Sequence, residues 1–248
     1  MFPDVREAFW KQSPHVKQVL SGLTASRVFI VPLFISEGYF SEEVIPRELG
    51  FRGQEQEAWS RALRRGGQML YYCKPIGTHD RMTEVLIARA RDIVERFPGP
   101  KPPEAEETTL FIAGHGTEQN ENSRIAIERQ VSFIRQRHLY AAVHALFLEE
   151  EPRIGHCYEL SQTRNVIVVP FFISDGLHTQ EDIPVLLGEP ESVVRQRLKG
   201  GQPAWQNPTE RRGKLVWYTP SVGTAPQVAD VILERVREAA ARRDEGSL

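Results

Sequence analysis

Cysteine is scarce in this chain of 248 residues, which contains two, Cys73 and Cys157, far apart and outside any C-x-x-C spacing. A disulfide framework, a zinc–cysteine site and a four-cysteine iron–sulfur cluster are therefore excluded, and we expect both thiols to be reduced in the cytoplasm. Long apolar runs are also missing, since the longest have the length of a strand. The first residues are typical of neither a signal peptide nor a membrane span, so no membrane partner is expected.

An excess of charge of either sign is absent as well. Lys and Arg number 31 against 33 Asp and Glu, which gives a net charge of −2, and no cluster of basic residues occurs. Nucleic acid is therefore not an expected partner. The motif G-x-x-x-x-G-K-[ST] does not occur, so no ATP site is expected. With 40% hydrophobic and 26% charged residues, the composition is that of a globular protein with one large or two ordinary α/β domains.

The sequence contains an internal repeat. Residues 31–50, VPLFISEGYFSEEVIPRELG, align without a gap with residues 169–188, VPFFISDGLHTQEDIPVLLG, at an offset of 138. Further on, residues 75–78 match residues 220–224, with Gly77 and Gly223 146 positions apart. The period is too long for a solenoid and indicates a duplicated domain. We place the first copy at 1–98, a Pro-rich linker at 99–107 and the second copy at 108–248.

Buried strands alternate with amphipathic helices in both copies. This pattern predicts the α/β class, with parallel sheets and helices on both faces. The expected strands and closing helices lie at 5–10, 27–34, 68–74 and 80–96 in the first copy, and at 109–113, 141–148, 165–172, 214–219 and 226–242 in the second.

The first copy is expected to be incomplete at its N-terminus. The counterpart of residues 114–116 would lie before residue 1, so the first copy should lack its first strand and helix and have the smaller sheet. A fragment, a misassigned start and a genuine trimming are explanations that the sequence leaves open. An incomplete sheet would expose an edge, which favours pairing into a homo-oligomer.

Residues 109–122, TLFIAGHGTEQNEN, contain the first candidate for chemistry. An apolar strand ends in Gly114-His115-Gly116, and a helical pattern follows. A polar residue at this point of an α/β sheet is presented at the carboxyl edge, and the flanking glycines allow a ligand to approach closely. His115 is therefore the first candidate, and a turn histidine without a role is the alternative.

Two further candidates follow other buried strands. His178, in Ile173-Ser174-Asp175-Gly176-Leu177-His178, would lie at the same edge and supply a second imidazole to a divalent metal. The alternative is a loop histidine near a helix start capped by Thr179 or Asp182. Glu149, in F-L-E-E-E-P, could hold a metal or accept a proton, with a plain acidic loop as the alternative.

The repeat provides an internal control for these candidates. The first copy has Phe40 where the second has His178, and Lys11 where it has Glu149. The shared scaffold thus keeps its apolar residues while the ionisable ones occur in one copy. We expect one active site, in the second copy. Trp205, in a long polar loop over 198–215, would either fold over a flat ligand or pack against the sheet.

Four motifs of the second copy together resemble the class II chelatases, the sirohydrochlorin cobaltochelatases and ferrochelatases. They are G-H-G-T at 114–117, F-L-E-x-x-P at 147–152, V-V-P-F-F-I-S-D-G-L-H-T-x-x-D-I-P at 168–184 and P-x-x-G-T at 220–224. The resemblance covers residues 108–240 and, without its beginning, residues 5–96. It implies two flavodoxin-like chelatase domains and a tetrapyrrole partner.

The resemblance also implies roles for the residues. His115 would bind the metal and accept a proton, His178 would be the second metal ligand, and Glu149 would be a carboxylate of the substrate site. The substrate-binding loop would consist of Ile173, Ser174, Asp175, Gly176, Leu177 and His178. The implied activity is ATP-independent insertion of a divalent metal into sirohydrochlorin or a relative in cobalamin or siroheme biosynthesis. Cobalt is the expected metal, with iron or nickel as alternatives, and no cofactor is implied beyond this substrate metal.

Two other functions remain open at this point. A metallochaperone or tetrapyrrole carrier would need the same histidines but would not turn over. A phosphatase with a strand-end histidine would need an arginine beside it, as in R-H-G, and here the neighbour of His115 is Gly114.

Overall fold

The computed structural model of the protein describes residues 2–53, 59–116 and 121–242. Its internal contacts divide the chain into two compact units, one formed by residues 1–32, 37–75 and 233–248 and the other by residues 33–36 and 76–232. Residues 117–120, which include the threonine of the G-H-G-T motif, lie outside the described residues.

The elements in chain order are α1 (Val16–Ser21), β1 (Arg27–Ile30), η1 (Tyr39–Val44), α2 (Ile45–Leu49), β2 (Ala62–Arg65), β3 (Gln68–Tyr72), η2 (Ile76–Thr78), α3 (Met82–Arg96), η3 (Ala105–Glu107), β4 (Thr108–Gly114), α4 (Asn122–Arg135), β5 (Ala142–Phe147), η4 (Ile154–His156), α5 (Cys157–Leu160), β6 (Asn165–Pro170), η5 (His178–Asp182), α6 (Ile183–Leu186), α7 (Glu191–Lys199), β7 (Thr209–Arg211), β8 (Lys214–Tyr218), η6 (Val222–Thr224) and α8 (Val228–Ala241).

A five-stranded sheet in the order β5-β4-β6-β8-β7 forms the second unit. Strands β4, β5, β6 and β8 run parallel, as the alternation of strands and helices predicts. Every residue of β4 is buried, because this strand lies in the sheet interior with a layer on each face. The carboxyl ends of β4, β5 and β6 are in register, with Gly114 opposite Phe147 and Ala113 opposite Pro170.

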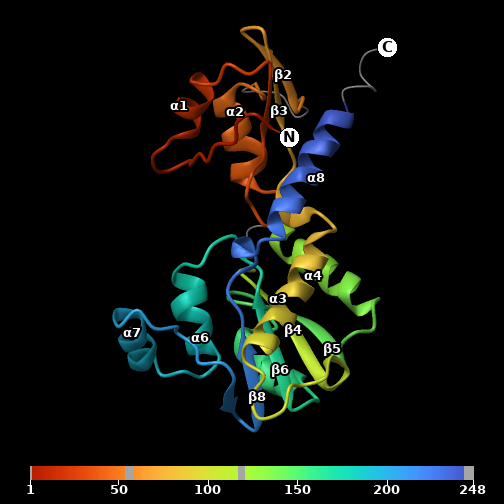
Figure 1. The fold of residues 1–248 in the computed structure, drawn as a ribbon, viewed down its shortest axis with the longest axis vertical. Helices are drawn as coiled ribbons and strands as arrows, with labels where there is room; N and C mark the ends of the chain where they lie inside the picture. The colour runs from red at the N-terminus through yellow and green to blue at the C-terminus, as the bar shows by residue number, and fades with distance from the viewer. Residues whose placement is uncertain (1, 54–58, 117–120, 243–248) are drawn as a thin grey trace. The chain divides into compact units, whose positions relative to one another are not determined.

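Helices cover both faces of this sheet. Figure 1 shows α3 and α4 side by side against it, in agreement with the contacts that α3 makes with β6 and β8 and α4 with β4 and β5. Phe111 and Val168 lie on the opposite face, in a cluster with Ile183 of α6 and with Leu187. The predicted fold class is therefore confirmed for the second unit.

The first unit has a smaller sheet, as expected. Among the described residues it contains three strands in the order β1-β3-β2. Residues 5–10, expected to form a strand, make a single bridge between Phe9 and His15. In the second unit the matching strand β5 pairs with β4, and the described sheet of the first unit has no counterpart of β4 beside β1.

Each sheet also carries an antiparallel edge strand that the pattern did not predict. Strand β2 pairs with β3, and β7 with β8. The turns between them contain two residues with positive φ, Gly66 (54°) and Gly67 (80°) in one, Arg212 (46°) and Gly213 (73°) in the other. Such turns match the twist of a two-residue hairpin, so R-G-G and R-R-G were the overlooked signals.

Trp205 and its neighbours belong to this sheet edge. The indole is 3% exposed and its Nε1 donates a hydrogen bond to the backbone oxygen of Val216 over 3.3 Å. The alternative in which Trp205 packs against the sheet is confirmed. Segment 198–215 thus contains the end of α7, strand β7, the start of β8 and the buried Trp205.

The compact units do not coincide with the predicted copies 1–98 and 108–248. Helix α3 closes the first copy in the sequence but packs in the second unit, because its apolar residues Val85, Leu86 and Ala90 are buried there. The later turns of α8, from Leu233 on, belong to the first unit. The boundaries of the two sequence copies therefore stay a prediction. In the folded protein, the closing helix of the first copy belongs to the second unit, and the end of the closing helix of the second copy belongs to the first unit.

The matched loops of the two copies repeat the same local structure. Thr179 at the start of η5 bonds through Oγ1 with the backbone of Gly176, and Ser41 bonds in the same way with Gly38. The hydroxyl of Tyr218 donates to the oxygen of Thr179 over 2.7 Å, and that of Tyr72 donates to the oxygen of Ser41 over 2.9 Å.

No helix among the described residues combines the length and apolar character needed to cross a membrane.

A buried polar contact tests the position of α3. Thr83 of α3 donates to Oε1 of Gln130 in α4 over 2.6 Å, and both residues are at most 1% exposed. Thr83→Val leaves the Gln130 oxygen buried without this donor, so we expect a loss of about 1–3 kcal/mol in the free energy of unfolding by urea. Thr83→Ser keeps the hydroxyl and is the control. Equal losses in both variants would contradict the contact.

Candidate functional site

His115 follows the last residue of β4 in a backbone that requires glycine on both sides. A β-carbon on Gly114 would lie 2.0 Å from Cδ1 of Ile127, and one on Gly116, at φ 63°, would lie 2.9 Å from Cβ of Phe147. No other residue fits these positions without displacing α4 or β5. The backbone oxygen of His115 also accepts from the amides of Leu148 and Glu149, over 3.0 and 3.1 Å. His115 is thereby tied to the end of β5.

His178 begins η5, in the segment that follows β6. Its Nδ1 lies 2.6 Å from Oδ2 of Asp182, four residues later on the same helical turn. The imidazole side chain is 44% exposed, so it is open to solvent on one side. A carboxylate that accepts from Nδ1–H orients an imidazole and leaves Nε2 with its lone pair, as metal-binding histidines require.

The structure brings the two predicted histidines together. Their ring centroids are 5.0 Å apart with an angle of 85° between the planes. Two imidazoles that share one metal at about 2.1 Å have centroids ~4.5–5.3 Å apart for usual coordination angles. Nδ1 of His115 lies 3.0 Å from the backbone oxygen of Gly116, so Nε2 is the atom available on this ring also. The pair therefore has the spacing and the free nitrogens of a two-histidine metal site.

The three carboxylates of F-L-E-E-E-P have different surroundings. Glu150 pairs with Arg124, and Glu151 lies 3.0 Å from Nδ1 of His156. Glu149 is the member that faces the site, with Oε1 3.8 Å from Nδ1 of His115 and a side chain that is 55% exposed. The geometry thus separates Glu149 from its neighbours, which the sequence ranked nearly equally.

Within the described residues, no group of three or more His, Cys, Asp or Glu side chains is arranged to hold a metal. The donor set here is two imidazoles with a carboxylate nearby, which suits a first-row divalent ion held loosely enough to be passed on.

The loop from Ile173 to Leu177 is anchored at its base. Asp175 accepts a hydrogen bond from the amide of Ser221 over 2.8 Å. Gly223 approaches so closely that a β-carbon would lie 1.8 Å from the oxygen of Ile173. Ser174 and Leu177, by contrast, are exposed, the latter by 61%. The loop therefore has a fixed base and an exposed surface beside His178.

Two residues of the site, Asp182 and Arg89, escaped the sequence interpretation. Asp182 was considered only as a helix cap, although the H-x-x-x-D spacing places it one turn from His178. Arg89 of α3 donates to Oγ1 of Thr224, whose hydroxyl donates to the oxygen of Ser221 over 3.1 Å. No local pattern could identify Arg89, because it comes from the first copy of the sequence and acts on a loop of the second.

These features define a class of protein. Duplicated α/β sequence, a mixed sheet that is mainly parallel, and paired histidines at its carboxyl edge are found together in the chelatase fold. The structure is similar to a multi-domain protein of Deinococcus radiodurans with structural similarity to chelatases, with a TM-score of 0.69 and 26% identity. The match covers 94% of this chain but 45% of that protein. SirB from Bacillus subtilis, solved with Fe³⁺, shares the fold with a TM-score of 0.63 and 19% identity, over 95% of this chain and 81% of SirB.

Sequence comparison gives the family. The chain matches the CbiX family model over residues 1–93 and 109–239. It is also 38% identical to a probable sirohydrochlorin cobaltochelatase of Halobacterium salinarum, over 97% of this chain and 81% of that protein. The chain belongs to the CbiX family of chelatases.

The contact between His178 and Asp182 leads to a test by metal binding. Asp182→Asn keeps the shape but no longer provides a carboxylate for Nδ1–H, so the affinity for Co²⁺, followed by its visible absorption, should fall about 10–100-fold. Glu181→Gln, which changes the neighbouring acid of the same helical turn, is the matched control and should bind as the unmodified protein does. If Asp182→Asn and Glu181→Gln bind Co²⁺ with equal affinity, Asp182 does not contribute to metal binding.

Proposed function

We propose that this protein inserts a divalent metal into sirohydrochlorin or a related tetrapyrrole without ATP, with cobalt as the first candidate, in cobalamin or siroheme biosynthesis. The single observation that carries the proposal is the contact between the imidazoles of His115 and His178, with their centroids 5.0 Å apart, their planes at 85° and an oxygen partner at each Nδ1. The name of the Halobacterium salinarum relative, a probable sirohydrochlorin cobaltochelatase, supports the choice of substrate and metal.

The metal arrives as a hydrated divalent ion and is a substrate. In this proposal, Nε2 of His115 and of His178 replace part of its water and hold it at the end of β4. Imidazole nitrogens bind such ions without the permanence of thiolates, which suits a site that must release the metal to the macrocycle. Asp182 keeps the His178 ring in position during this exchange.

Insertion also requires two proton acceptors. The macrocycle loses two pyrrole N–H protons as two nitrogen–metal bonds form, so the charge of the metal is balanced by the protons that leave. Glu149, with its exposed carboxylate 3.8 Å from His115, can accept one. His115 can accept the other once the metal has left its Nε2.

The loop of Ile173, Ser174, Asp175, Gly176, Leu177 and His178 is proposed to contact the tetrapyrrole. Leu177 exposes 61% of its surface next to His178, which provides an apolar contact for a flat ring. Because Asp175 fixes the base of the loop through Ser221, the ring would be held at a set distance from the imidazoles.

Anaerobic insertion of Co²⁺, Fe²⁺ and Ni²⁺ into sirohydrochlorin, followed by absorbance, tests the proposal. His115→Ala and His178→Ala should each lose the catalysed rate, and Glu149→Gln should lower kcat by about 10²-fold or more because a proton acceptor is lost. His138→Asn, outside the site at a position of positive φ that Asn tolerates, should leave the rate unchanged. Stoichiometric binding of metal or ring without turnover would instead make the protein a carrier.

Arg89 is proposed to act on this reaction by positioning. Arg89→Gln removes the cation that holds Thr224 and, through it, the loop bearing His178, so we expect kcat to fall about tenfold or more while the affinity for Co²⁺ changes little. Arg91→Gln, an exposed arginine of the same helix, is the control. A loss of Co²⁺ affinity as large as the loss of kcat would contradict a positioning role.

A further inference from the structure

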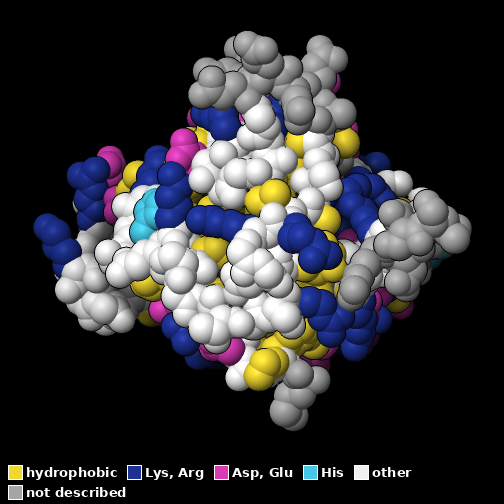
Figure 2. All heavy atoms as spheres, turned by 90° about the horizontal axis from the view of Figure 1, so that it is seen from above, with side chains coloured by type: hydrophobic (Ala, Val, Ile, Leu, Met, Phe, Trp, Pro, Cys, Tyr) yellow, Lys and Arg dark blue, Asp and Glu magenta, His cyan; other side chains and the backbone are white. Residues whose placement is uncertain are grey.

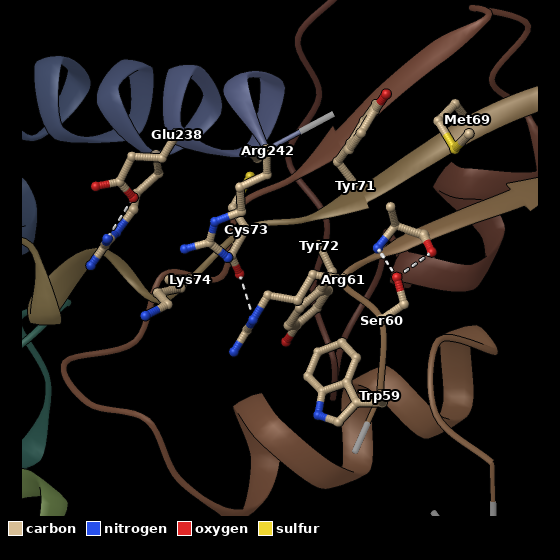
Figure 3. Close-up of a pocket in the computed structure, with 13 residues that line it drawn as sticks. Trp59, Ser60, Arg61, Met69, Tyr71, Tyr72, Cys73, Lys74, Glu238 and Arg242 are labelled. Carbon is tan, nitrogen blue, oxygen red and sulfur yellow. Dashed lines mark hydrogen bonds and ion pairs between the residues drawn. The ribbon is translucent and has the colours of Figure 1, made fainter. Parts of the chain in front are cut away.

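The first unit contains a cavity of about 570 Å³ that shares no residue with the candidate metal site. It opens between strand β3 and the later turns of α8, with residues 59–62 at its rim (Figure 3). Its size lies within the range of sites for small molecules.

The wall contributed by α8 has an unusual composition for a helix that faces a sheet. Arg235, Glu238, Ala239 and Arg242 line the cavity, and their spacing of i, i+3, i+4 and i+7 places them on one helix face. Apolar residues normally occupy such a face. Here three of the four are charged and the fourth is alanine, so the side chains do not fill the space above β3.

Two of the cations in the cavity have an anionic partner. Arg61 pairs with Glu42, donates to the oxygen of Cys73 over 3.2 Å and lies against the ring of Trp59, with 4.7 Å from Cζ to the ring centroid. Arg235 pairs with Glu238 over 2.7 Å.

The other two cations are Lys74, whose charge acts on Glu42 without a hydrogen bond, and Arg242. Neither Nζ of Lys74 nor the guanidinium of Arg242 makes a hydrogen bond or ion pair with any residue that the structure describes. Figure 3 shows both side chains on the side of β3 that also carries Arg61. On the face of the molecule in Figure 2, Lys and Arg side chains lie interspersed with hydrophobic and neutral ones. Two cations without a hydrogen-bond partner among the described residues, at one cavity, suit a small anion.

The cavity also contains a thiol that takes no part in charge recognition. Burial raises the pKa of Cys73 to about 12 despite the nearby arginines, so the thiol stays protonated.

The second unit provides a comparison, because larger apolar side chains stand there at two of the matching positions. At the offset of 146, Tyr71 corresponds to Trp217, which is 0% exposed, and Ala239 corresponds to Ile93, which is 6% exposed. Arg61 and Lys74 correspond to Asn207 and Pro220. Asn207 uses its amide group to bond both the amide and the oxygen of Tyr218, over 2.7 and 2.8 Å. The charged positions of the helix face recur in α3 as Arg89, Asp92 and Arg96. The two units therefore differ at this place in the size of the side chains, with Trp217 and Ile93 in the second unit where the first has Tyr71 and Ala239.

We propose that this cavity binds a small anion carried on a flat ring, with a phosphate or carboxylate group held by Lys74 and Arg242 and the ring placed beside Trp59. Cations pair with such groups through charge-assisted hydrogen bonds, and an indole face stacks on planar ligands. The proposal is independent of the metal chemistry at His115 and His178.

Calorimetric titration of the whole protein with adenosine monophosphate and with phthalate distinguishes the phosphate from the carboxylate form of the ligand. We expect at least one to bind, and adenosine or inorganic phosphate alone to bind at least about tenfold more weakly, because each lacks half of the recognised chemistry. Lys74→Gln and Arg242→Gln should each weaken binding about tenfold. Arg65→Gln, an exposed arginine of β2 outside the cavity, should not weaken it.

Ala239→Ile, which copies Ile93 at the matching position of α3, fills the cavity and should abolish binding while circular dichroism shows a folded protein. His178→Ala should leave binding unchanged, which separates this cavity from the metal site. The proposal is wrong if neither anion binds at millimolar concentration, or if Ala239→Ile or the two charge variants bind as the unmodified protein does.

Discussion

Close approach at glycine is the constraint on which the candidate site depends. Gly114 and Gly116 allow α4 and Phe147 to pack against the turn that carries His115, and Gly223 allows its own loop to touch the oxygen of Ile173. A β-carbon at any of these positions would push apart the strand ends that carry the two imidazoles. Backbone packing at these glycines therefore sets the distance of 5.0 Å between the two ring centroids.

Duplication shows how little of the scaffold has to change for a site to be present or absent. Both copies keep the π-helical turn, the hydroxyl at Ser41 or Thr179 and the tyrosine that bonds to it. At the positions of Glu149 and His178 the first copy has Lys11 and Phe40, and the ammonium group of Lys11 lies 5.5 Å from the centroid of the Phe40 ring. A cation–π pair thus replaces an imidazole and a carboxylate on the same framework.

The two copies also differ in how their closing helices are used. Helix α3 provides apolar residues to the sheet of the second unit and, through Arg89, a cation that reaches the loop next to Asp175. The counterpart of Arg89 in α8 is Arg235, which donates to the oxygen of Pro75 in the first unit over 3.0 Å. In both cases an arginine of one copy hydrogen-bonds to a loop of the other, so the loops of the candidate site in the second unit contact residues from both halves of the sequence.

The sequence by itself determined the α/β class, the repeat and the parallel strands, because apolar periodicity and the positions of glycine are local signals. It also indicated His115, His178 and Glu149 as candidates, which stay a prediction. It missed the antiparallel edge strands, whose R-G-G and R-R-G turns carry a weaker local signal, and it assumed that each copy keeps its own closing helix. Only the tertiary structure decided that α3 packs in the second unit, that Asp182 orients His178 and that Glu149 rather than Glu150 or Glu151 faces His115. These outcomes depend on which surfaces meet after folding, and contacts between distant residues leave no regular pattern along one chain.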